Sequence, residues 1–281
     1  YNTFVGYKTG ILNTSGNENV FLGYKSGYSN LSGRGNVFIG DEAGVFNTSG
    51  YWNVFLGQNS GRSNTSGNVN VFIGQNCANS NLTGSGNICI GENAYRQDTD
   101  GDENVFIGKR AGMEKHGNYN VMIGSEAGGA NYLGTGPNVS NSIMIGRKSG
   151  FLSSGVYNVL LGVETEIEGD SCILIGHGLD AYDKFGNPQS NVLKIDDGGN
   201  NTHPLIFGHF HGDRVGINDG APGANLHIKQ VGSGEEGLAI ENDTDSDTWS
   251  FEVGVNDMFL SFNGTNVGQW DDATGAYNTV S

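Results

Sequence analysis

The chain has 281 residues, of which 48 are glycine and only 4 are proline, and its formal net charge is −16. This acidic charge argues against nucleic-acid binding, which needs a basic surface to neutralise phosphate groups. No glycine recurs at every third position, which excludes collagen, and the regular spacing of apolar residues argues against a disordered chain.

A five-residue phrase recurs along the first part of the sequence. It reads Asn-Val-Phe-Leu-Gly at 19–23, and its closing glycine returns every 17 residues from Gly6 to Gly108. The step then becomes 16, 22, 16 and 14 residues, as far as Gly176. A short fixed period predicts a stack of similar coils in which each coil contacts its neighbours.

The remainder of each repeat favours tight corners. Two further glycine columns and an asparagine column follow the phrase, and both residue types tolerate left-handed backbone conformations. We therefore predict an all-β fold: a stacked β-roll or β-helix of about ten coils of about 17 residues, as a shaft or head over 1–176.

The phrase has two apolar sides. Because side chains alternate along a strand, Val20 and Leu22 point one way while Asn19 and Phe21 point the other. We expect the Val and Leu columns, with a column of small residues, to fill the coil, and the aromatic column to face other chains. The predicted interface residues are Phe21, Phe38, Phe55, Phe72, Cys89 and Phe106. An amide ladder is predicted beside them, at Asn19, Asn36, Asn53, Asn70, Asn87 and Asn104.

The repeats resemble those of two kinds of surface fibre. Asn-Val-Phe-Ile-Gly, followed by a small residue and glycine, is similar to the Ser-Val-Ala-Ile-Gly repeats of trimeric autotransporter adhesin heads. It also resembles the glycine-rich repeats of some bacteriophage tail fibres. The resemblance covers 1–176 and implies a homotrimer, but the longer period means that coil shape and handedness do not carry over.

Three cysteines do not form a disulfide or zinc framework. Cys77 and Cys89 replace residues of the small and aromatic columns, and Cys172 opens a degenerate repeat. We interpret all three as packed thiols, since no zinc-type pairing is present.

The period stops after Gly176. We interpret 177–190 as a connector, 191–230 as a small β-module, and 231–281 as a C-terminal β-module at the tip, because short alternating segments are separated by Asp-, Gly- and Pro-rich turns. Trp249, Trp270 and Tyr277 would suit a carbohydrate-binding face; the alternative, which we favour for Trp249 and Trp270, is that these two side chains pack a small core.

The C-terminal part carries a second resemblance. Pro204-Leu-Ile-Phe-Gly208, Arg214-Val-Gly-Ile-Asn218 and Leu226-His-Ile228 are similar to a segment near the ends of many phage tail fibres and spikes. In those proteins the segment precedes an intramolecular chaperone that trimerises the chain and then cuts itself off. The last residues, 275–281, resemble the stretch before that cut, so the resemblance implies that Ser281 is a maturation terminus.

Two kinds of metal site are suggested by the sequence, each with a plainer alternative. His209 and His211 lie on one side of a predicted strand, and a threefold axis would bring six imidazoles around one transition metal; the alternative is surface or packed histidines. The acidic run 98–103 resembles the start of a calcium loop but lacks its downstream Glu, which favours an ordinary turn. Asp243, Asp245 and Asp247 occupy alternate positions in the sequence. They could bind calcium together, or they could form a solvated acidic loop.

Nothing in the sequence forms a catalytic constellation with supporting context, and only the insertion at 129–141 lengthens a coil. We therefore expect no enzyme activity, and a structural and host-receptor-binding segment of a trimeric bacteriophage tail fibre, located on the virion. Its expected partners are further copies of itself, other tail-fibre or baseplate proteins, and a host cell-surface glycan or protein. Alternatives are a bacterial surface adhesin or extracellular filament subunit and, third, a polysaccharide depolymerase with paired carboxylates.

Overall fold

The structure is a computed structural model that describes two compact units, Tyr1–Asn201 and Thr202–Ser281. Side chains and backbone are described for residues 1–97, 99–113, 117–129, 139–182, 187–197, 205–208, 214–217, 225–226 and 228. The backbone alone is described for residues 209 and 227 and for the strands at 236–242, 247–253, 257–262, 265–271 and 276–279.

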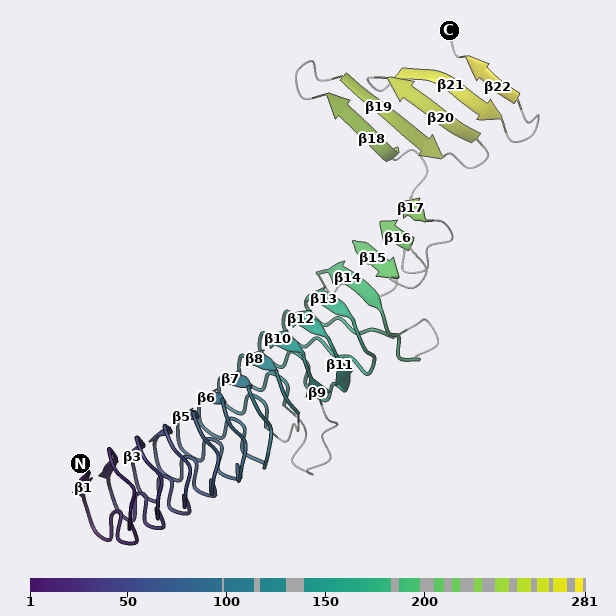
Figure 1. The fold of residues 1–281 in the computed structure, drawn as a ribbon. Coiled ribbons are helices and arrows are strands. Elements are labelled where there is room, and N and C mark those ends of the chain that lie inside the picture. Colours follow the sequence, from purple (N-terminus) through teal and green to yellow (C-terminus); the bar gives the residue numbers. More distant parts are fainter. Residues whose placement is uncertain are drawn as a thin grey trace. The chain divides into compact units, whose positions relative to one another are not determined.

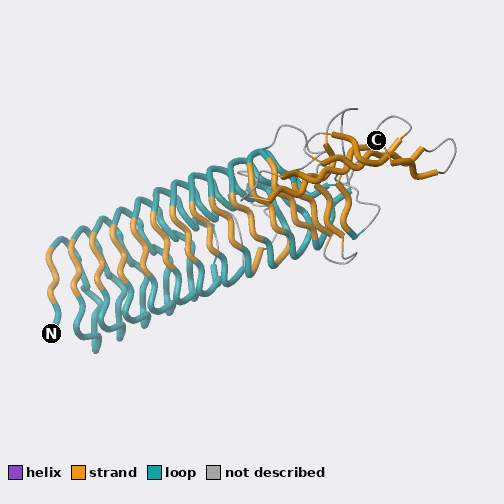
Figure 2. Tube along the Cα trace, turned by 90° about the horizontal axis from the view of Figure 1, so that it is seen from above, coloured by secondary structure: helices purple, strands orange, loops and turns teal. Residues whose placement is uncertain are grey.

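The first unit is a parallel β-solenoid, in which each turn of the chain adds one short strand to the same sheet (Figures 1 and 2). The strands of this sheet that lie in the first unit are β1 (Thr3–Val5), β2 (Val20–Leu22), β3 (Val37–Ile39), β4 (Val54–Leu56), β5 (Val71–Ile73), β6 (Ile88–Ile90), β7 (Val105–Ile107), β8 (Val121–Ile123), β10 (Ile143–Ile145), β12 (Val159–Leu161), β13 (Ile173–Gly176) and β14 (Val192–Asp196). A second, short sheet pairs β9 (Val139–Ser140) with β11 (Gly155–Val156). The predicted all-β stack of coils is confirmed.

The strand pairing keeps equivalent residues of successive repeats side by side. Phe38 pairs with Phe21 in the preceding strand and with Phe55 in the following one. The register survives the longest coil, because Met122 of β8 pairs with Met144 of β10. The extra residues of that coil fall between these strands and leave the pairing intact. The phrase around each strand, and not the length of the coil, sets the register.

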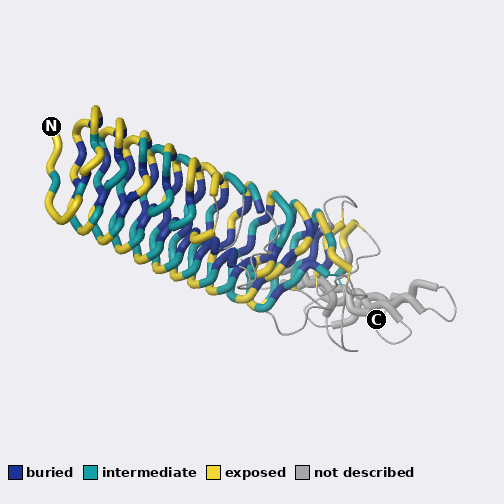
Figure 3. Tube along the Cα trace, turned by 90° about the horizontal axis from the view of Figure 1, so that it is seen from below, coloured by how far each residue is buried: buried dark blue, intermediate teal, exposed yellow. Residues whose placement is uncertain are grey.

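The aromatic column lies inside the coil, which corrects the predicted orientation of the strands. The interface prediction named Phe21, Phe38, Phe55, Phe72, Cys89 and Phe106, and each of these side chains is at most 1% exposed within the single chain. The prediction that they face other chains is therefore wrong. The alternation itself was predicted correctly, but it is the Val, Ile and Leu residues on either side of each core residue that point outward. Figure 3 shows how the buried positions recur from coil to coil.

Stacked rings and a glycine column explain why the phenylalanines point inward. Phe38 and Phe55 are nearly parallel, with ring centroids 4.7 Å apart, which matches the spacing of adjacent strands. Gly61 lies against the ring of the same coil and has φ +55°; a Cβ there would come within 2.5 Å of Phe55 Cε2. The residue before that glycine, such as Ser60, is also fully buried. One large side chain and two small ones thus fill each coil.

Buried asparagines tie the coils together, as the predicted ladder requires. Asn53 Nδ2 donates to the carbonyl oxygen of Gly67 at 2.8 Å, and Asn53 Oδ1 accepts from the backbone N–H of Asn70 at 2.9 Å. The same bonds recur along the predicted column. A second asparagine ladder stands elsewhere in the coil, where Asn47 Nδ2 donates to Asn30 Oδ1 at 2.8 Å. Along the predicted column each buried amide finds partners, which is the condition for burying it at modest cost, whereas in the second ladder the buried Oδ1 of Asn81 has no hydrogen-bond partner.

The solenoid extends past the boundary predicted at residue 176. Strand β14 pairs in parallel with β13, with Lys194 beside Leu174 in the core column. Leu179 and Ala181, in the predicted connector 177–190, are buried in the coil between these strands. The connector is therefore a further coil, and the first unit ends near Asn201.

The second unit is also built of strands, and its described parts form two groups. β15 (Ile206–His209) pairs antiparallel with β16 (Arg214–Ile217), which pairs in parallel with β17 (Leu226–Ile228). An antiparallel sheet follows, in the order β18 (Glu236–Asn242), β19 (Asp247–Val253), β20 (Asp257–Phe262), β21 (Thr265–Asp271) and β22 (Ala276–Thr279). Neighbouring strands in this sheet are also neighbours in sequence.

Candidate functional surface

The outer side of the solenoid sheet is a continuous band of aliphatic side chains, which we call the aliphatic face. It consists of the first and third residues of each strand from β2 to β8 and of β10, β12 and β13, together with Leu193 and Ile195 of β14. Every one of these positions is Val, Ile or Leu. Because the core residue between them points inward, both flanking side chains point outward.

The aliphatic face is substantially open in the single chain. Val20 is 40% exposed, and Ile39 and Ile88 are 36% and 38% exposed. The sequence prediction placed these columns in the interior and so missed this surface. The available signal was the glycine six residues after every core phenylalanine except Phe72, where Ala78 stands, because a large inward ring needs that space.

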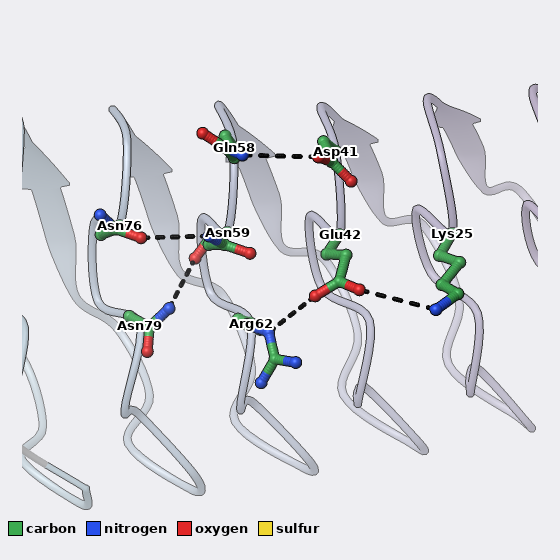
Figure 4. Close-up of polar contacts among 8 residues, drawn as sticks. All are labelled: Lys25, Asp41, Glu42, Gln58, Asn59, Arg62, Asn76 and Asn79. Atoms are coloured by element: carbon green, nitrogen blue, oxygen red, sulfur yellow. Dashed lines mark hydrogen bonds and ion pairs between the residues drawn. The ribbon is translucent and has the colours of Figure 1, made fainter.

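One edge of the aliphatic face is a polar corner that follows each strand (Figure 4). Arg62 Nε donates to Glu42 Oε2 at 2.9 Å, and Lys25 Nζ lies 3.8 Å from Glu42 Oε1. Beside them, Gln58 Nε2 donates to Asp41 Oδ2 at 3.4 Å. These side chains come from successive coils, so opposite charges and amides meet along the stack. Such pairs, which are partly exposed to solvent, add little stability.

The other edge is the corner before each strand, where the backbone is left-handed. Trp52 (φ 55°) and Val69 (φ 58°) occupy equivalent positions there and are 55% and 53% exposed. The guanidinium of Arg34 lies 5.6 Å from the centre of the Trp52 ring and 5.9 Å from that of Tyr51. Bulky and β-branched residues are unusual in this conformation, so this corner carries local strain.

The core column ends on a charged residue. Lys194 is only 3% exposed; its Nζ donates to the carbonyl oxygen of Asp180 at 2.7 Å and lies 3.7 Å from Asp180 Oδ1. Burial lowers the pKa of Lys194, and the attraction of Asp180 opposes that shift. A lysine can occupy the position of a buried leucine here because the carbonyl and carboxylate of Asp180 compensate for its lost hydration.

Other ionisable groups near this end also have shifted pKa values. Burial raises the pKa of the Glu166 carboxyl, and the negative charge of Asp180 raises it further. Burial raises the pKa of the Tyr182 hydroxyl, with Glu168 adding to the shift. The pKa of the Cys172 thiol is also raised, mainly by burial. A thiol with a raised pKa is a poor nucleophile, which gives Cys172 a packing role.

The predicted cysteines and metal ligands have different outcomes. Cys77, Cys89 and Cys172 are buried thiols, as predicted. His209 lies on β15 opposite Arg214, but its side chain is outside the described residues, as is all of His211. The transition-metal prediction is therefore not tested. Within the described part of the chain, no group of three His, Cys, Asp or Glu side chains is arranged to hold a metal ion.

The remaining predicted positions lie partly outside the described residues. Asp98 and the segment 243–246 are not described, so neither calcium prediction is tested, and Ser281 is not described either. Trp249, Trp270 and Tyr277 lie on β19, β21 and β22, where only the backbone is described.

Comparison of the chain with protein-family profiles, with curated proteins and with solved structures finds no match. In the described residues, no helix is long and apolar enough to cross a membrane.

Proposed function

We propose that the chain is a structural and receptor-binding segment of an extracellular fibre, of the trimeric bacteriophage tail-fibre type, and that it has no enzymatic role. The single observation that supports this function is the unbroken stacking of coils from β1 to β14, which makes the first unit a rod roughly 50 Å long. A rod of this kind separates what is attached at its two ends.

The internal contacts of the rod suit a mechanical role. Backbone hydrogen bonds join each coil to the next, for example from Val54 N–H to the carbonyl of Asn70 at 2.8 Å. Asparagine side chains and stacked rings repeat the same contacts along the axis. Load along the stack is therefore shared among many equivalent bonds. This repeated contact between coils is the most extensive set of interactions in the first unit.

We place receptor binding in the second unit, in the short segments of sequence that link successive strands of the antiparallel sheet β18–β22. Variable turns on a fixed sheet are a common way to build a recognition surface, since loops tolerate sequence change better than the strands that hold them. A host cell-surface glycan or protein is the proposed ligand. We also propose that the chain associates with further copies of itself and with other tail-fibre or baseplate proteins, and that it is located on the virion.

Immunogold electron microscopy with antibodies against the purified chain tests this function. Cultures of the source organism are induced to release phage, and particles and cells are labelled in parallel. We expect gold on the fibres of phage particles. Label confined to the envelope of uninduced cells would overturn the phage assignment in favour of a surface adhesin. A matched labelling with pre-immune antibody sets the background.

A further inference from the structure

The aliphatic face is an uncharged surface on a strongly acidic chain. The outward positions of its strands carry only Val, Ile and Leu, whereas the whole chain contains 30 acidic and 14 basic residues. The neighbouring corner holds charged and amide side chains such as Asp41, Glu42 and Gln58 (Figure 4). An apolar centre with a polar rim is the usual layout of a protein interface.

The size of the aliphatic face also points to a partner. Three-residue strands spaced as in a sheet give a band roughly 50 Å long and 10 Å wide, or about 500 Å². Monomeric proteins rarely leave a larger contiguous apolar patch than about 300–600 Å², and patches of that size are often functional. Two such faces in contact bury on the order of 1,000 Å², and three about 1,500 Å², which reaches the range of specific interfaces.

Charge and repeat length identify the partner as another copy. The chain has a net charge of −16, so most surfaces of two copies repel each other. The aliphatic face carries no charge and allows close approach. A second copy presents an apolar surface of the same length and the same strand spacing, so the two faces match along the whole stack.

We propose that the aliphatic face is the surface through which copies of this chain associate, with the outward Val, Ile and Leu side chains of one rod packed against those of another. This deepens the proposed function, on which it rests for treating the chain as part of a fibre. In this proposal the contact between chains is formed by the Val, Ile and Leu columns on either side of the phenylalanine column, which is internal.

Mass measurement of the purified chain tests the proposal directly. Sedimentation equilibrium should give a multiple of the chain mass of 29.7 kDa. The face variant combines Ile39→Lys and Ile88→Lys, two positions that are more than one third exposed, so that a single chain can hold both lysines at its surface. We expect this variant to sediment as a monomer of about 29.7 kDa with an unchanged β-sheet circular dichroism spectrum.

The matched control combines Gln58→Lys and Gln75→Lys. Both residues lie on the adjacent polar corner, and the control adds the same charge to the same region of the rod. It should keep the mass of the unaltered chain. A monomeric unaltered chain, or a face variant that keeps the assembled mass, would overturn the proposal. Equal dissociation of the control would overturn it too, because charge anywhere on the rod would then suffice.

A gentler variant covers the case in which the double lysine change prevents folding. Ile88→Cys places a thiol on the aliphatic face, and Gln75→Cys places one on the polar corner, while the natural cysteines are buried. We expect a thiol reagent to label position 88 at least tenfold more slowly than position 75. Equal rates would show that the face is open and overturn the proposal. If the purified chain is a monomer but antibodies against it still label phage fibres, the proposed contact is overturned and the proposed function stands.

Discussion

Coils with phenylalanine in the core differ from those with another residue there, although both belong to one sheet. From β1 to β5 the core residue is always Phe, and the rings stack 4.7–4.9 Å apart. Later coils, apart from that of Phe106 in β7, place other residues in the same register. These are Cys89, Met122, Met144, Leu160, Leu174 and Lys194. The strand pairing is the same in both groups, so the backbone register does not depend on the stacked rings.

The coil of Cys89 shows what stays constant from one coil to the next. In the coil of β4, Phe55 faces Gly61. In the coil of β6, the small Cys89 takes the position of the phenylalanine and Tyr95 takes the position of the glycine. The Tyr95 ring is fully buried, 4.7 Å from the ring of Phe106, and its hydroxyl donates to the carbonyl of Gly101 at 3.0 Å. The large side chain has moved to the other wall of the coil. The filled volume of each coil, and not a particular residue, is what the fold requires.

The largest expected effect is the loss of one stacked ring. Phe55→Ala should lower the free energy of unfolding by about 3–5 kcal/mol, because it removes a fully buried ring and leaves a cavity between two others. Urea denaturation followed by circular dichroism measures this. Gln58→Ala, on the exposed corner, should stay within about 0.5 kcal/mol. A Phe55→Ala loss as small as that of the control would mean that the column does not hold the coils together.

The exchange of Cys89 and Tyr95 for the usual pair sharpens the comparison. Cys89→Phe alone should cost about 1–3 kcal/mol by overpacking against Tyr95. Tyr95→Gly alone should cost about 3–5 kcal/mol by opening a cavity. The double variant restores the pair seen at Phe55 and Gly61, and we expect it within about 1.5 kcal/mol of the natural chain. A double-mutant cycle by urea denaturation measures the coupling; simple additivity would contradict volume compensation.

Removal of one ladder asparagine should have the next largest effect. Asn53→Ala leaves the buried N–H of Asn70 and the carbonyl of Gly67 without their side-chain partners, at a cost of about 1–3 kcal/mol. Asn158, beside Leu160, makes the same two contacts, with Gly169 and Cys172, at 2.9 Å each. Asn158→Ala should therefore cost as much in thermal or urea unfolding. A clearly smaller loss at Asn158 would show that the ladder matters only beside stacked rings.

The sequence predicted the period, the strands and the ladder because each depends on local pattern. Glycine spacing marks the coil, and alternation marks the strand, independently of anything far away in the chain. The orientation of the strand could not be predicted from hydrophobicity, because Phe21 and its neighbours Val20 and Leu22 make both sides apolar. Only the fit between Phe21 and Gly27 across the coil distinguishes inside from outside.

The end of the solenoid was missed for a related reason. Between β13 and β14 the phrase is lost and the core position holds Lys194, so neither period nor hydrophobicity continues. The parallel pairing continues because Lys194 finds the carbonyl and carboxylate of Asp180. A charged residue buried by a partner distant in sequence leaves no signal in a local pattern.

Relief of corner strain should give a modest gain in the phenylalanine coils. Val69→Asn replaces a β-branched residue at φ 58° with one that tolerates the left-handed region, so we expect stability to rise by about 1 kcal/mol. The reverse change at the other corner, Asn76→Val (φ 52°), should cost a similar amount. Thermal unfolding of both variants measures the pair. A loss at Val69→Asn would mean that the exposed valine contributes packing that outweighs its strain.

The smallest expected effect lies at the irregular end of the solenoid, where Glu166 stands beside Asp180. The pKa of Glu166 is raised from its usual 4.5, first by burial and then by the neighbouring carboxylate, so the folded chain holds this proton more tightly than the unfolded chain. Folding is therefore favoured while both states are protonated, below about pH 4.5, and this contribution is lost as the pH rises through the folded pKa. Glu166→Gln removes the ionised form and should stabilise the chain at pH 7, by less than about 1 kcal/mol because the side chain is partly exposed to solvent. Urea midpoints of both proteins at pH 4 and pH 7 measure this, with Asp41→Asn on the exposed corner as the control for a general loss of negative charge. An equal gain at both pH values, or the same gain in the control, would show that the ionisation of Glu166 is not the cause.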